Sequence, residues 1–392
     1  MAQYYVDLHV HIGRSSGGRE IKKATANNLT FENIAFESYY RKGIHVIGVV
    51  DCISPYVIED IDSLLERGEL VEKRAGGMEY RGGQTLILGA EIETHEKHGC
   101  SSHSLCFFPT LTQIKEFSEE MSKHIRNIRF SAIQSRLTGQ QLFDIVDAHG
   151  GVFIPAHAFT PHKSFYGNCC NSLHEIFNDP AYEKIPTVEL GLSADSMMAS
   201  HLSELDGKTF ISNSDAHSLP KMGREYNIFE MEEPTYEDIL KALKNQDGRR
   251  VVANYGLNPK LGKYHRSYCE ICDTVIEGEP PVLKCPVSEN HSVVVGVRDR
   301  LEIIQDREVE KMEGRAPYHY QIPLEFLPKV GPKTIDKLIS KFGNEMRILH
   351  NATLDELSEV VKEDIAKNII LAREGKLGIE VGGGGVYGKI EG

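Results

Sequence analysis

Histidine and acidic residues recur at the ends of short apolar runs between residues 4 and 217. The first run, YYVDLHVHIG over residues 4–13, places His9 and His11 on one face of an extended segment, because side chains two residues apart point the same way. Later runs end in the same residue types: Asp51, Glu91, His103, His157, Glu189, Asp195, Asp215 and His217. Imidazole and carboxylate ligands together suit zinc, manganese or iron rather than magnesium or calcium. The sequence therefore predicts a metal centre.

A centre with several divalent ions has a defined chemistry. Such ions polarise a phosphoryl oxygen, lower the pKa of a bound water toward about 7 and stabilise the leaving oxygen. Glu91 and Asp215 suit bridging positions, since each carboxylate has two oxygens for two ions. Glu189 and Asp195 are left open as supporting or purely structural residues. We interpret the chain as a multinuclear metal hydrolase.

Residues 1–255 alternate short β-rich runs with helix-like segments such as 56–67, 111–126 and 138–148. Repeated β-then-α order predicts a parallel sheet, either open or closed into a barrel. In such barrels the active site lies at the carboxyl ends of the strands, where the residues above fall. At 392 residues the chain is longer than one ordinary domain, so smaller units are expected after residue 255.

The composition indicates where in the cell the protein acts and which kinds of partner it binds. The longest apolar run, HVIGVV, is far shorter than the roughly 18 to 20 residues of a membrane span, and the N-terminus has no signal pattern. We expect a cytoplasmic protein, nucleoid-associated when bound to DNA, with reduced cysteines and no membrane partner. The net charge of −13 argues against general attraction to nucleic acid, but the segment 241–266 is basic. Its Arg249 and Arg250 are candidate DNA contacts; the alternative is a solvated face.

A cysteine cluster follows the first block. Cys269-x2-Cys272 precedes Cys285 and His291, a spacing typical of a closed structural zinc site with four ligands. A second CxxC would need cysteine at position 288, where Ser288 stands, so His291 completes the set. The alternatives are ordinary reduced thiols or, less in keeping with the context, a redox pair. We predict a zinc-binding module over residues 264–306.

Residues 317–378 have a helical pattern throughout. Within them LPKVGPKTIDKLISKFG, residues 327–343, resembles the helix-hairpin-helix element of DNA repair proteins, whose turn presents backbone N–H groups and lysine to a DNA phosphate. The resemblance assigns Lys329, Gly331 and Lys333 to DNA binding, although lysine at 329 replaces a usual glycine. A plain helical hairpin with a solvated lysine face is the alternative. The glycine-rich residues 379–392 are expected to form a flexible tail.

The motifs DLHVH, GAE, SSH, PAH and SDAH, in this order, resemble the polymerase-and-histidinol-phosphatase (PHP) family of metal phosphoesterases. The resemblance implies a distorted seven-stranded β/α (PHP) barrel over residues 1–255 with two or three divalent ions, zinc or, in activity, manganese or magnesium. It implies one ion among His9, His11, Glu91 and Asp215, a second among Glu91, His103 and His157, and a third served by His217 and Asp51. The chain departs from the family at IGRSSGG and at Asp51-Cys52, where the family often has ligands of the third ion. The third ion is therefore left open.

The order of barrel, zinc module and helical hairpin resembles endonuclease Q and its bacterial relatives, as do PAHAFTP, GLSAD and SNSDAHSLPKMGREYN. This resemblance implies a DNA repair endonuclease that hydrolyses the phosphodiester bond 5′ to deaminated bases (hypoxanthine, uracil, xanthine) and abasic sites, with the lesion nucleotide flipped out. Asp215, Glu91 and His217 are then the catalytic residues. Lys221 and Arg224 would contact phosphate, and Phe165, Tyr166 and Asn168 would line the lesion pocket.

The expected partner is damaged double- or single-stranded DNA, and the protein is expected to act as a monomer. Contacts with replication or repair proteins are left open. One alternative function is a phosphoesterase acting on a small phosphate monoester, which would have no use for the zinc module and hairpin. Another is a catalytically idle DNA-binding scaffold, against which the complete set of motifs argues.

Overall fold

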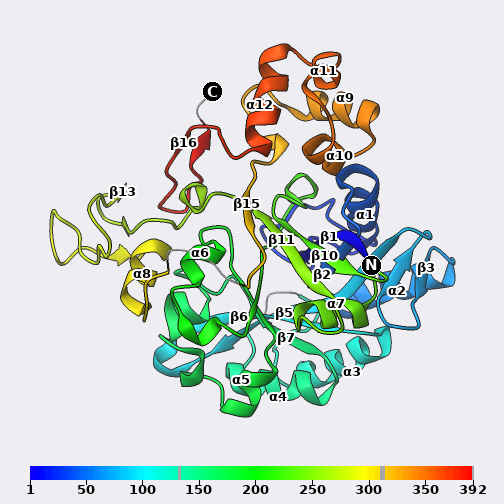
Figure 1. Ribbon diagram of the computed structural model, residues 1–392. Helices are drawn as coiled ribbons and strands as arrows, with labels where there is room; N and C mark the ends of the chain where they lie inside the picture. Colours follow the sequence, from blue (N-terminus) through cyan, green and yellow to red (C-terminus); the bar gives the residue numbers. More distant parts are fainter. Residues whose placement is uncertain (131–133, 310–313, 391–392) are drawn as a thin grey trace.

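A computed structural model describes residues 1–130, 134–309 and 314–390, and strands at its centre are surrounded by helices (Figure 1). Seven strands form a ring in chain order: β1 Ala2–Val10, β2 Val46–Val49, β5 Gln84–His95, β6 Ser101–Phe108, β7 Val152–Pro155, β8 Thr187–Glu189 and β9 Thr209–Ile211. Ala158 N donates to Glu189 O and joins β7 to β8. A bridge between Val10 and Ala216 then closes the ring from the segment after β9 onto β1. The predicted distorted seven-stranded barrel is confirmed.

The strands of the barrel are only partly parallel. β1, β2 and β5 run parallel to one another, as do β8 and β9, but β6 is antiparallel to both β5 and β7. The reason lies in the connection: residues 96–100 are too few for the helical crossover that parallel neighbours need, so β5 and β6 form a hairpin. The expectation of a parallel sheet is corrected here. As a consequence, β6 brings the residues at its amino end to the carboxyl end of β5.

Helices with one apolar face cover the barrel: α1 Phe31–Phe36, α2 Pro55–Glu66, α3 Leu111–Ser122, α4 Gly139–Ala148, α5 Asp179–Lys184, α6 Ser196–Ala199 and α7 Tyr236–Leu243. In α4, Thr138 caps the helix and Leu142, Phe143 and Val146 are buried. The sheet continues beyond the ring through β10 Tyr226–Met231 and β11 Arg250–Gly256 beside β1, and through β4 Met78–Tyr80 and β3 Leu70–Glu72 beside β5. In the described part of the chain, no helix is long and apolar enough to cross a membrane.

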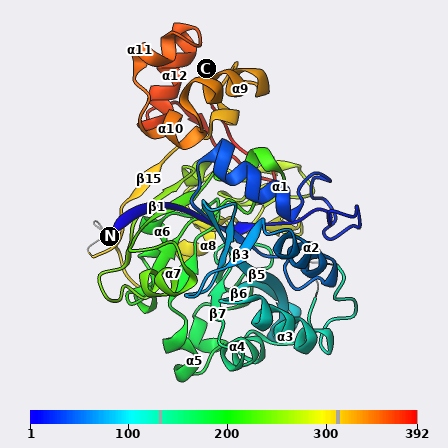
Figure 2. The same ribbon diagram turned by 90° about the vertical axis from the view of Figure 1, so that its right-hand side faces the viewer.

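Two smaller units follow the barrel. The first has three short strands, β12 Tyr268–Cys269, β13 Thr274–Val275 and β14 Val293–Val294, and helix α8 Val297–Ile304. The second is a lobe of four helices, α9 Pro332–Phe342, α10 Glu345–His350, α11 Leu354–Ser358 and α12 Glu363–Arg373, which stands above the barrel (Figure 2). Strand β15 Tyr318–Tyr320 leads into this lobe and pairs with β11, so the lobe is tied to the barrel sheet.

The glycine-rich C-terminus is folded, which corrects the expectation of a flexible tail over its described part, residues 379–390. Strands β16 Ile379–Glu380 and β17 Lys389–Ile390 form a hairpin. Gly382 N donates to Lys260 O at 2.7 Å and Gly388 N donates to Leu261 O at 2.9 Å. A Cβ at Gly388 would lie 2.1 Å from Glu380 O. The glycines of this segment therefore allow close contact between backbones and do not make the segment flexible.

Gly48 lies in β2 against the backbone of β1, and its replacement tests the packing of the barrel. A Cβ at this position would lie 2.4 Å from Leu8 O. Overpacking of this kind costs about 1 to 3 kcal/mol, so Gly48→Ala is expected to lower the Tm by several degrees. Gly207→Ala is the matched control, since no atom of the described residues lies within 4 Å of its added Cβ. A thermal melt in which both variants unfold together would contradict this packing.

Glu225 gives the barrel a pH dependence of stability. Burial raises the pKa of this carboxyl to about 8, although Leu257 N–H and Arg224 lower it. Leu257 N donates to Oε1 at 2.8 Å, and Oε2 has no hydrogen-bond partner among the described residues. The folded protein therefore keeps a proton that the unfolded chain releases above the ordinary pKa of 4.5. The contribution of Glu225 to stability is therefore fully present below pH 4.5 and falls as the pH rises to about 8.

The expected result is that Glu225→Gln flattens this decline and melts above the wild type at pH 9. Thermal melts at pH 5, 7 and 9 measure the effect, with the exposed Glu233→Gln as control. If Glu225→Gln and the control keep the same slope as the wild type, Glu225 is not the titrating group.

Candidate active site

The predicted ligands of two metal ions meet at one end of the barrel. Their side chains come from β1, β5, β6 and the segments that follow β1, β7 and β9. They form two groups: His9, His11 and Asp215, and Glu91, His103 and His157. Within each group the ligand atoms lie within 4.8 Å of one another. Mixed imidazole and carboxylate donors at this spacing fit divalent ions. The structure therefore brings these six candidate ligands together.

Glu91 lies between the two groups. Its Oε1 is 2.8 Å from His103 Nδ1 and 3.4 Å from His157 Nε2, and its Oε2 is 3.6 Å from His11 Nε2. Burial raises the pKa of Glu91, but His103, Lys22 and His11 outweigh it and hold the pKa well below its usual range. Glu91 is therefore an ionised carboxylate placed to serve both groups.

Two ligand residues have unusual backbone conformations. His157 has φ 29° and Asp215 has φ 45°, values that residues other than glycine seldom adopt. Such conformations cost about 1 to 3 kcal/mol each and persist where surrounding contacts impose them. His157 N donates to Glu189 Oε2 at 2.7 Å, and Arg224 Nη2 donates to Asp215 O at 3.4 Å. The strain turns both side chains toward the group of ligands.

Residues behind the ligands hold them in place. Glu189 lies 3.0 Å from His9 Nδ1 and accepts from Asn213 Nδ2 at 2.8 Å, so it orients His9. Glu93 is 3.4 Å from His103 Nε2 and 2.9 Å from Lys163 Nζ, and it orients His103 in the same way. Asp195 instead caps α6 and accepts from Tyr320 OH at 2.7 Å. Glu189 therefore supports a candidate ligand, His9, whereas Asp195 has a structural role at the start of α6.

The residues expected at a third ion are arranged differently. Asp51 Oδ2 accepts from Ile12 N at 2.6 Å and lies 3.1 Å from His11 Nδ1, so it supports His11 from behind. His217 Nδ1 is 3.5 Å from Asp215 Oδ1, and burial lowers the pKa of His217 to about 4, which keeps its imidazole neutral. Neither residue belongs to the two ligand groups.

Lys22 is a site residue that the sequence did not reveal. Its Nζ lies 3.0 Å from Glu91 Oε2 and 3.0 Å from His11 Nε2, and only 11% of its side chain is exposed. It comes from the loop after β1, in which the chain departs from the PHP family pattern. The only sequence signal for this role is that Lys22 is a basic residue close to IGRSSGG, where the chain departs from the family pattern.

The ligand groups lie at a cavity of about 480 Å³. Besides the ligands, its walls carry cationic and aromatic side chains from several parts of the chain: Lys22, His162, Lys163, Lys221, Arg224, Lys263, Tyr264 and Tyr387. Lys221 and Arg224 were predicted here as phosphate contacts, and Lys163 belongs to the loop that was expected to form the pocket wall. Lys263, Tyr264 and Tyr387 were not predicted at this site. The floor of the cavity therefore offers metal ligands and its walls offer positive charge.

The expected lesion pocket of Phe165, Tyr166 and Asn168 is corrected. Phe165 and Tyr166 are fully buried in the hydrophobic core, and Asn168 Nδ2 donates to Ser101 O at 3.4 Å. None of the three lines the cavity. Thr160, His162 and Lys163 of the same loop line the cavity instead. The apolar rings of the loop turn inward because their burial in the core is favourable.

Arg249 and Arg250 do not reach the site. Arg249 precedes β11 and Arg250 begins it. Arg250 pairs with Glu230 of β10, and Glu230 pairs with Gln3 at the amino end of β1. Arg249 Nη2 is 2.7 Å from a Glu232 oxygen, and Arg250 Nε is 3.0 Å from a Glu230 oxygen. The expected role in DNA binding finds no support in this position, because both charges are paired at the opposite end of the barrel.

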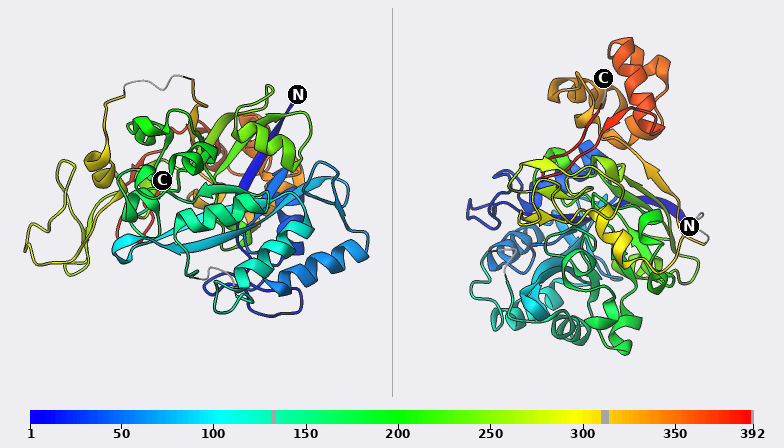
Figure 3. Two further views of the ribbon diagram at one scale, coloured as in Figure 1. Left: turned by 90° about the horizontal axis from the view of Figure 1, so that it is seen from below. Right: turned by 90° about the vertical axis from the view of Figure 1, so that its left-hand side faces the viewer.

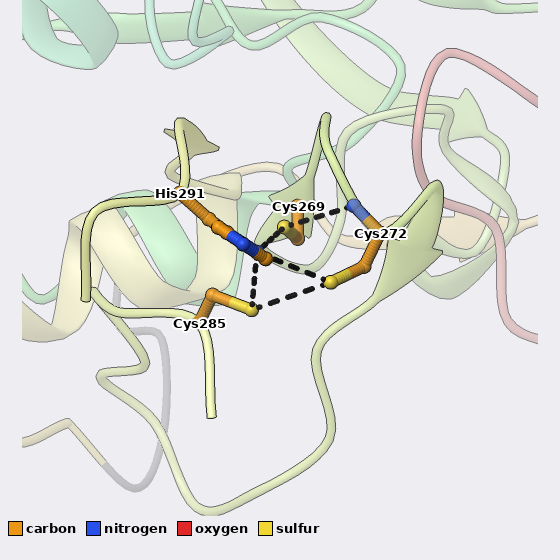
Figure 4. Close-up of side chains that lie close together, drawn as sticks. All are labelled: Cys269, Cys272, Cys285 and His291. Atoms are coloured by element: carbon orange, nitrogen blue, oxygen red, sulfur yellow. Dashed lines mark hydrogen bonds between the residues drawn. The ribbon is translucent and has the colours of Figure 1, made fainter. Parts of the chain in front are cut away.

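The zinc ligands predicted from their spacing come together in the small module (Figure 4). His291 Nδ1 lies 3.3 Å from Cys272 Sγ, 3.4 Å from Cys285 Sγ and 3.6 Å from Cys269 Sγ. Burial raises the pKa of Cys285, but the N–H groups of Ser288 and Val287 outweigh it and lower the pKa to about 6. A thiolate is the form that binds zinc, so this donor set fits a tetrahedral ion.

In the helical lobe, the turn before α9 is exposed. Gly331 is the N-cap of α9 without a side-chain cap, and Lys329 has φ 66°, the conformation usually left to glycine. Lys329, Gly331 and Lys333 are all exposed, although Lys329 Nζ lies 3.1 Å from Asp364. The element before the turn is a short 3-10 helix, Leu324–Phe326, rather than the full first helix of a helix-hairpin-helix.

Comparisons with known proteins agree with this architecture. A family model described as PHP-associated matches residues 197–247. The Bacillus subtilis protein YqxK is 45% identical over 395 residues and covers 100% of both chains. The crystal structure of the lesion-specific endonuclease PfuEndoQ from Pyrococcus furiosus superposes with a TM-score of 0.84 and 32% identity, covering 100% of this chain and 95% of that one. The chain belongs to the endonuclease Q family. It is a metal-dependent phosphodiester hydrolase built on the PHP fold.

A second endonuclease Q structure, a complex with a 27-mer duplex that has an abasic lesion at the active site, matches with the same TM-score of 0.84 and covers 96% of that chain. The Methanocaldococcus jannaschii protein MJ0043 is 39% identical over 254 residues, which span 60% of this chain and 31% of that protein. The full-length matches include the module of β12–β14 and the helical lobe, so the family likeness extends beyond the barrel.

Proposed function

We propose that this protein is a DNA repair endonuclease that hydrolyses the phosphodiester bond 5′ to deaminated bases (hypoxanthine, uracil, xanthine) and abasic sites. The observation that carries the proposal is the pair of ligand groups that meet at Glu91 beneath a cavity with cationic walls. The full-length likeness to an endonuclease Q bound to an abasic duplex supports DNA as the substrate.

Each part of the site has a task in this reaction. His9, His11 and Asp215 would hold one ion, Glu91, His103 and His157 a second, and Cys269, Cys272, Cys285 and His291 a structural zinc. When bound, the two active-site ions supply Lewis-acid activation of the phosphate and of the attacking water. Lys22 places a fixed positive charge beside Glu91, where it offsets negative charge that develops on the phosphate. Glu189 and Glu93 keep His9 and His103 in their ligand orientations.

The recessed site favours an extruded nucleotide. The ligand groups lie at the floor of a cavity whose volume of about 480 Å³ is in the range of small-molecule pockets. A base stacked in a duplex keeps its phosphate outside such a cavity, so the lesion nucleotide would rotate out of the helix to enter it. Rotation costs a few kcal/mol, and least for mispaired or missing bases, which itself favours lesions.

The helical lobe offers a second contact with DNA. The exposed turn of Lys329, Gly331 and Lys333 presents backbone N–H groups at the amino end of α9 together with two ammonium groups. Such a turn binds one backbone phosphate without reading sequence. We expect it to add affinity for duplex DNA, whatever the lesion.

The test uses end-labelled duplexes with one deoxyinosine, one deoxyuridine, one abasic analogue or no lesion. Each duplex is incubated with the protein and Mn²⁺, Mg²⁺ or Zn²⁺, with EDTA and Asp215→Ala as controls. Metal-dependent nicking 5′ to the lesion, lost in the variant, is the expected result. Intact DNA in every lane, combined with hydrolysis of p-nitrophenyl phosphate, would favour the small phosphate monoester instead.

Lys22→Met tests the role of the buried ammonium. We expect kcat for nicking to fall about 10²-fold, because a preorganised charge at the reacting phosphate is lost. Lys23→Met is the matched control, since Lys23 is the exposed neighbour. Single-turnover nicking measures the effect, and the metal content of the same samples separates lost chemistry from lost metal. Equal rates for the two variants would exclude a role for Lys22.

A further inference from the structure

The C-terminal hairpin forms part of the active-site wall. It lies between the module of β12–β14 and the helical lobe in Figure 1, and the right-hand view of Figure 3 shows it running along the module. Gly385 N donates to Lys263 O at 3.1 Å, and Cβ atoms at Gly383 and Gly384 would lie 2.4 Å from Val275 and 2.3 Å from Tyr268. The hairpin is therefore fixed against both the barrel linker and the module, and it carries Tyr387 into the cavity.

Tyr387 contacts two cationic side chains of the cavity. Arg224 Nη1 donates to the phenol oxygen at 2.8 Å, and the guanidinium carbon of Arg224 lies 5.5 Å from the ring centroid. Lys263 Nζ lies 4.7 Å from the same centroid. A cation over an aromatic ring at these distances is attracted by about 0.5 to 2 kcal/mol. On its other side, Arg224 Nε donates to Ser214 O at 2.7 Å, next to the ligand Asp215.

Lys221, Arg224 and Lys263 form a cationic cluster beside the metal ligands, and all three line the cavity. Burial and repulsion from Lys221 and Arg224 lower the pKa of Lys263. Asp215 acts in the opposite direction on the pKa of Lys263. Like charges held together in this way favour the binding of a further anion. Arg224 is only 6% exposed, so its orientation is set by its neighbours rather than by solvent. The cluster is arranged for an anionic group that enters the cavity.

We propose that the cationic cluster and Tyr387 form a phosphate-binding subsite, and that Tyr387 is a positioning residue that holds Arg224 and Lys263 toward the phosphate. The ligand is a phosphate group of the DNA backbone next to the one that is cleaved; this identification rests on the proposed function. The phenol hydroxyl fixes the guanidinium in one orientation. The ring keeps both cations near the cavity and leaves their charge free, whereas a carboxylate would neutralise it. The glycine-rich tail is then required for phosphate binding, because it places the ring of Tyr387 in the cavity.

The experiment compares the wild type with Tyr387→Phe, Tyr387→Leu and Val386→Ala in the full-length, metal-loaded protein. Val386 is the matched control because it is the neighbouring residue of the hairpin and is 66% exposed. The first measurement is the affinity for inorganic phosphate, from its effect on the Tm. The second is steady-state nicking of an abasic duplex, with KM and kcat determined separately.

We expect Tyr387→Leu to weaken phosphate binding about tenfold and to raise KM for the duplex by a similar factor, with a smaller change in kcat. Tyr387→Phe keeps the ring and should fall between Tyr387→Leu and the wild type, and Val386→Ala should match the wild type. If Tyr387 only stabilises the fold, Tyr387→Leu lowers the Tm while phosphate affinity and KM stay at the wild-type values, and the proposal is overturned. Should Tyr387→Leu fail to fold, wild-type phosphate affinity and KM in the conservative Tyr387→Phe would overturn it equally.

The two proposals fail in different ways. A wild-type protein that binds inorganic phosphate through Tyr387 but nicks no duplex would leave the subsite intact and contradict the proposed function. Nicking that is metal-dependent, with phosphate affinity unaffected in both Tyr387 variants, would support the function and remove the subsite.

Discussion

Glu91→Gln is expected to reduce nicking by at least about 10³-fold and to remove metal from the active site. Glu91 Oε1 lies 2.8 Å from His103 Nδ1, and Oε2 lies 3.6 Å from His11 Nε2, so one carboxylate serves both ligand groups. An amide keeps the shape of the side chain but has one acceptor oxygen and no charge. Both ions should bind more weakly, and the loss of their Lewis acidity removes most of the rate enhancement.

Metal content is the decisive measurement for Glu91→Gln. After dialysis, elemental analysis should find the active-site ions depleted and one zinc retained by the four ligands of the separate module. The exposed Glu59→Gln, whose carboxylate is 2.8 Å from Arg19 Nη1 at the surface, is the control and should keep full metal content and activity. A Glu91→Gln protein with wild-type metal content and rate would contradict the bridging position.

Cys285→Ser is expected to release one zinc ion and to unfold the small module while the barrel stays folded. The module has little else to stabilise it: its apolar core consists of Cys269, Ile276 and Cys285, with three partly buried neighbours. Structural zinc contributes about 10 to 16 kcal/mol in zinc-finger peptides, so the loss of one thiolate outweighs such a core. Because the hairpin packs on Val275 and Tyr268, the unfolded module should also release Tyr387 and raise KM for duplex DNA.

Zinc content and limited proteolysis measure this effect. Cleavage should appear between residues 270 and 292 in Cys285→Ser and be absent in Cys100→Ser, whose thiol lies outside the ligand set and donates to Lys97 O at 3.1 Å. Retention of the zinc ion by Cys285→Ser, with no new cleavage, would show that the three remaining ligands suffice.

Fold and ligands were accessible from the sequence wherever the physical cause is local. Side chains two residues apart share a face of a strand, so His9 and His11 had to converge, and successive barrel strands had to bring Glu91 and Asp215 to the same end. The four residues of the expected zinc site lie close together along the chain, between Cys269 and His291, and the structure brings them together. Turn and helix signals such as the Thr138 cap also act within a few residues.

Only the tertiary structure decided which side chains enter the cavity from loops and from the distant C-terminus. Phe165 and Tyr166 turn into the core because burial of apolar rings outweighs any attraction to the site. Arg249 and Arg250 lie at the far end because β10 runs antiparallel to β1 and returns the chain to the amino end of β1, where β11 begins. Tyr387 reaches the cavity only because glycines allow its hairpin to approach two other units closely, and no local pattern encodes such an approach.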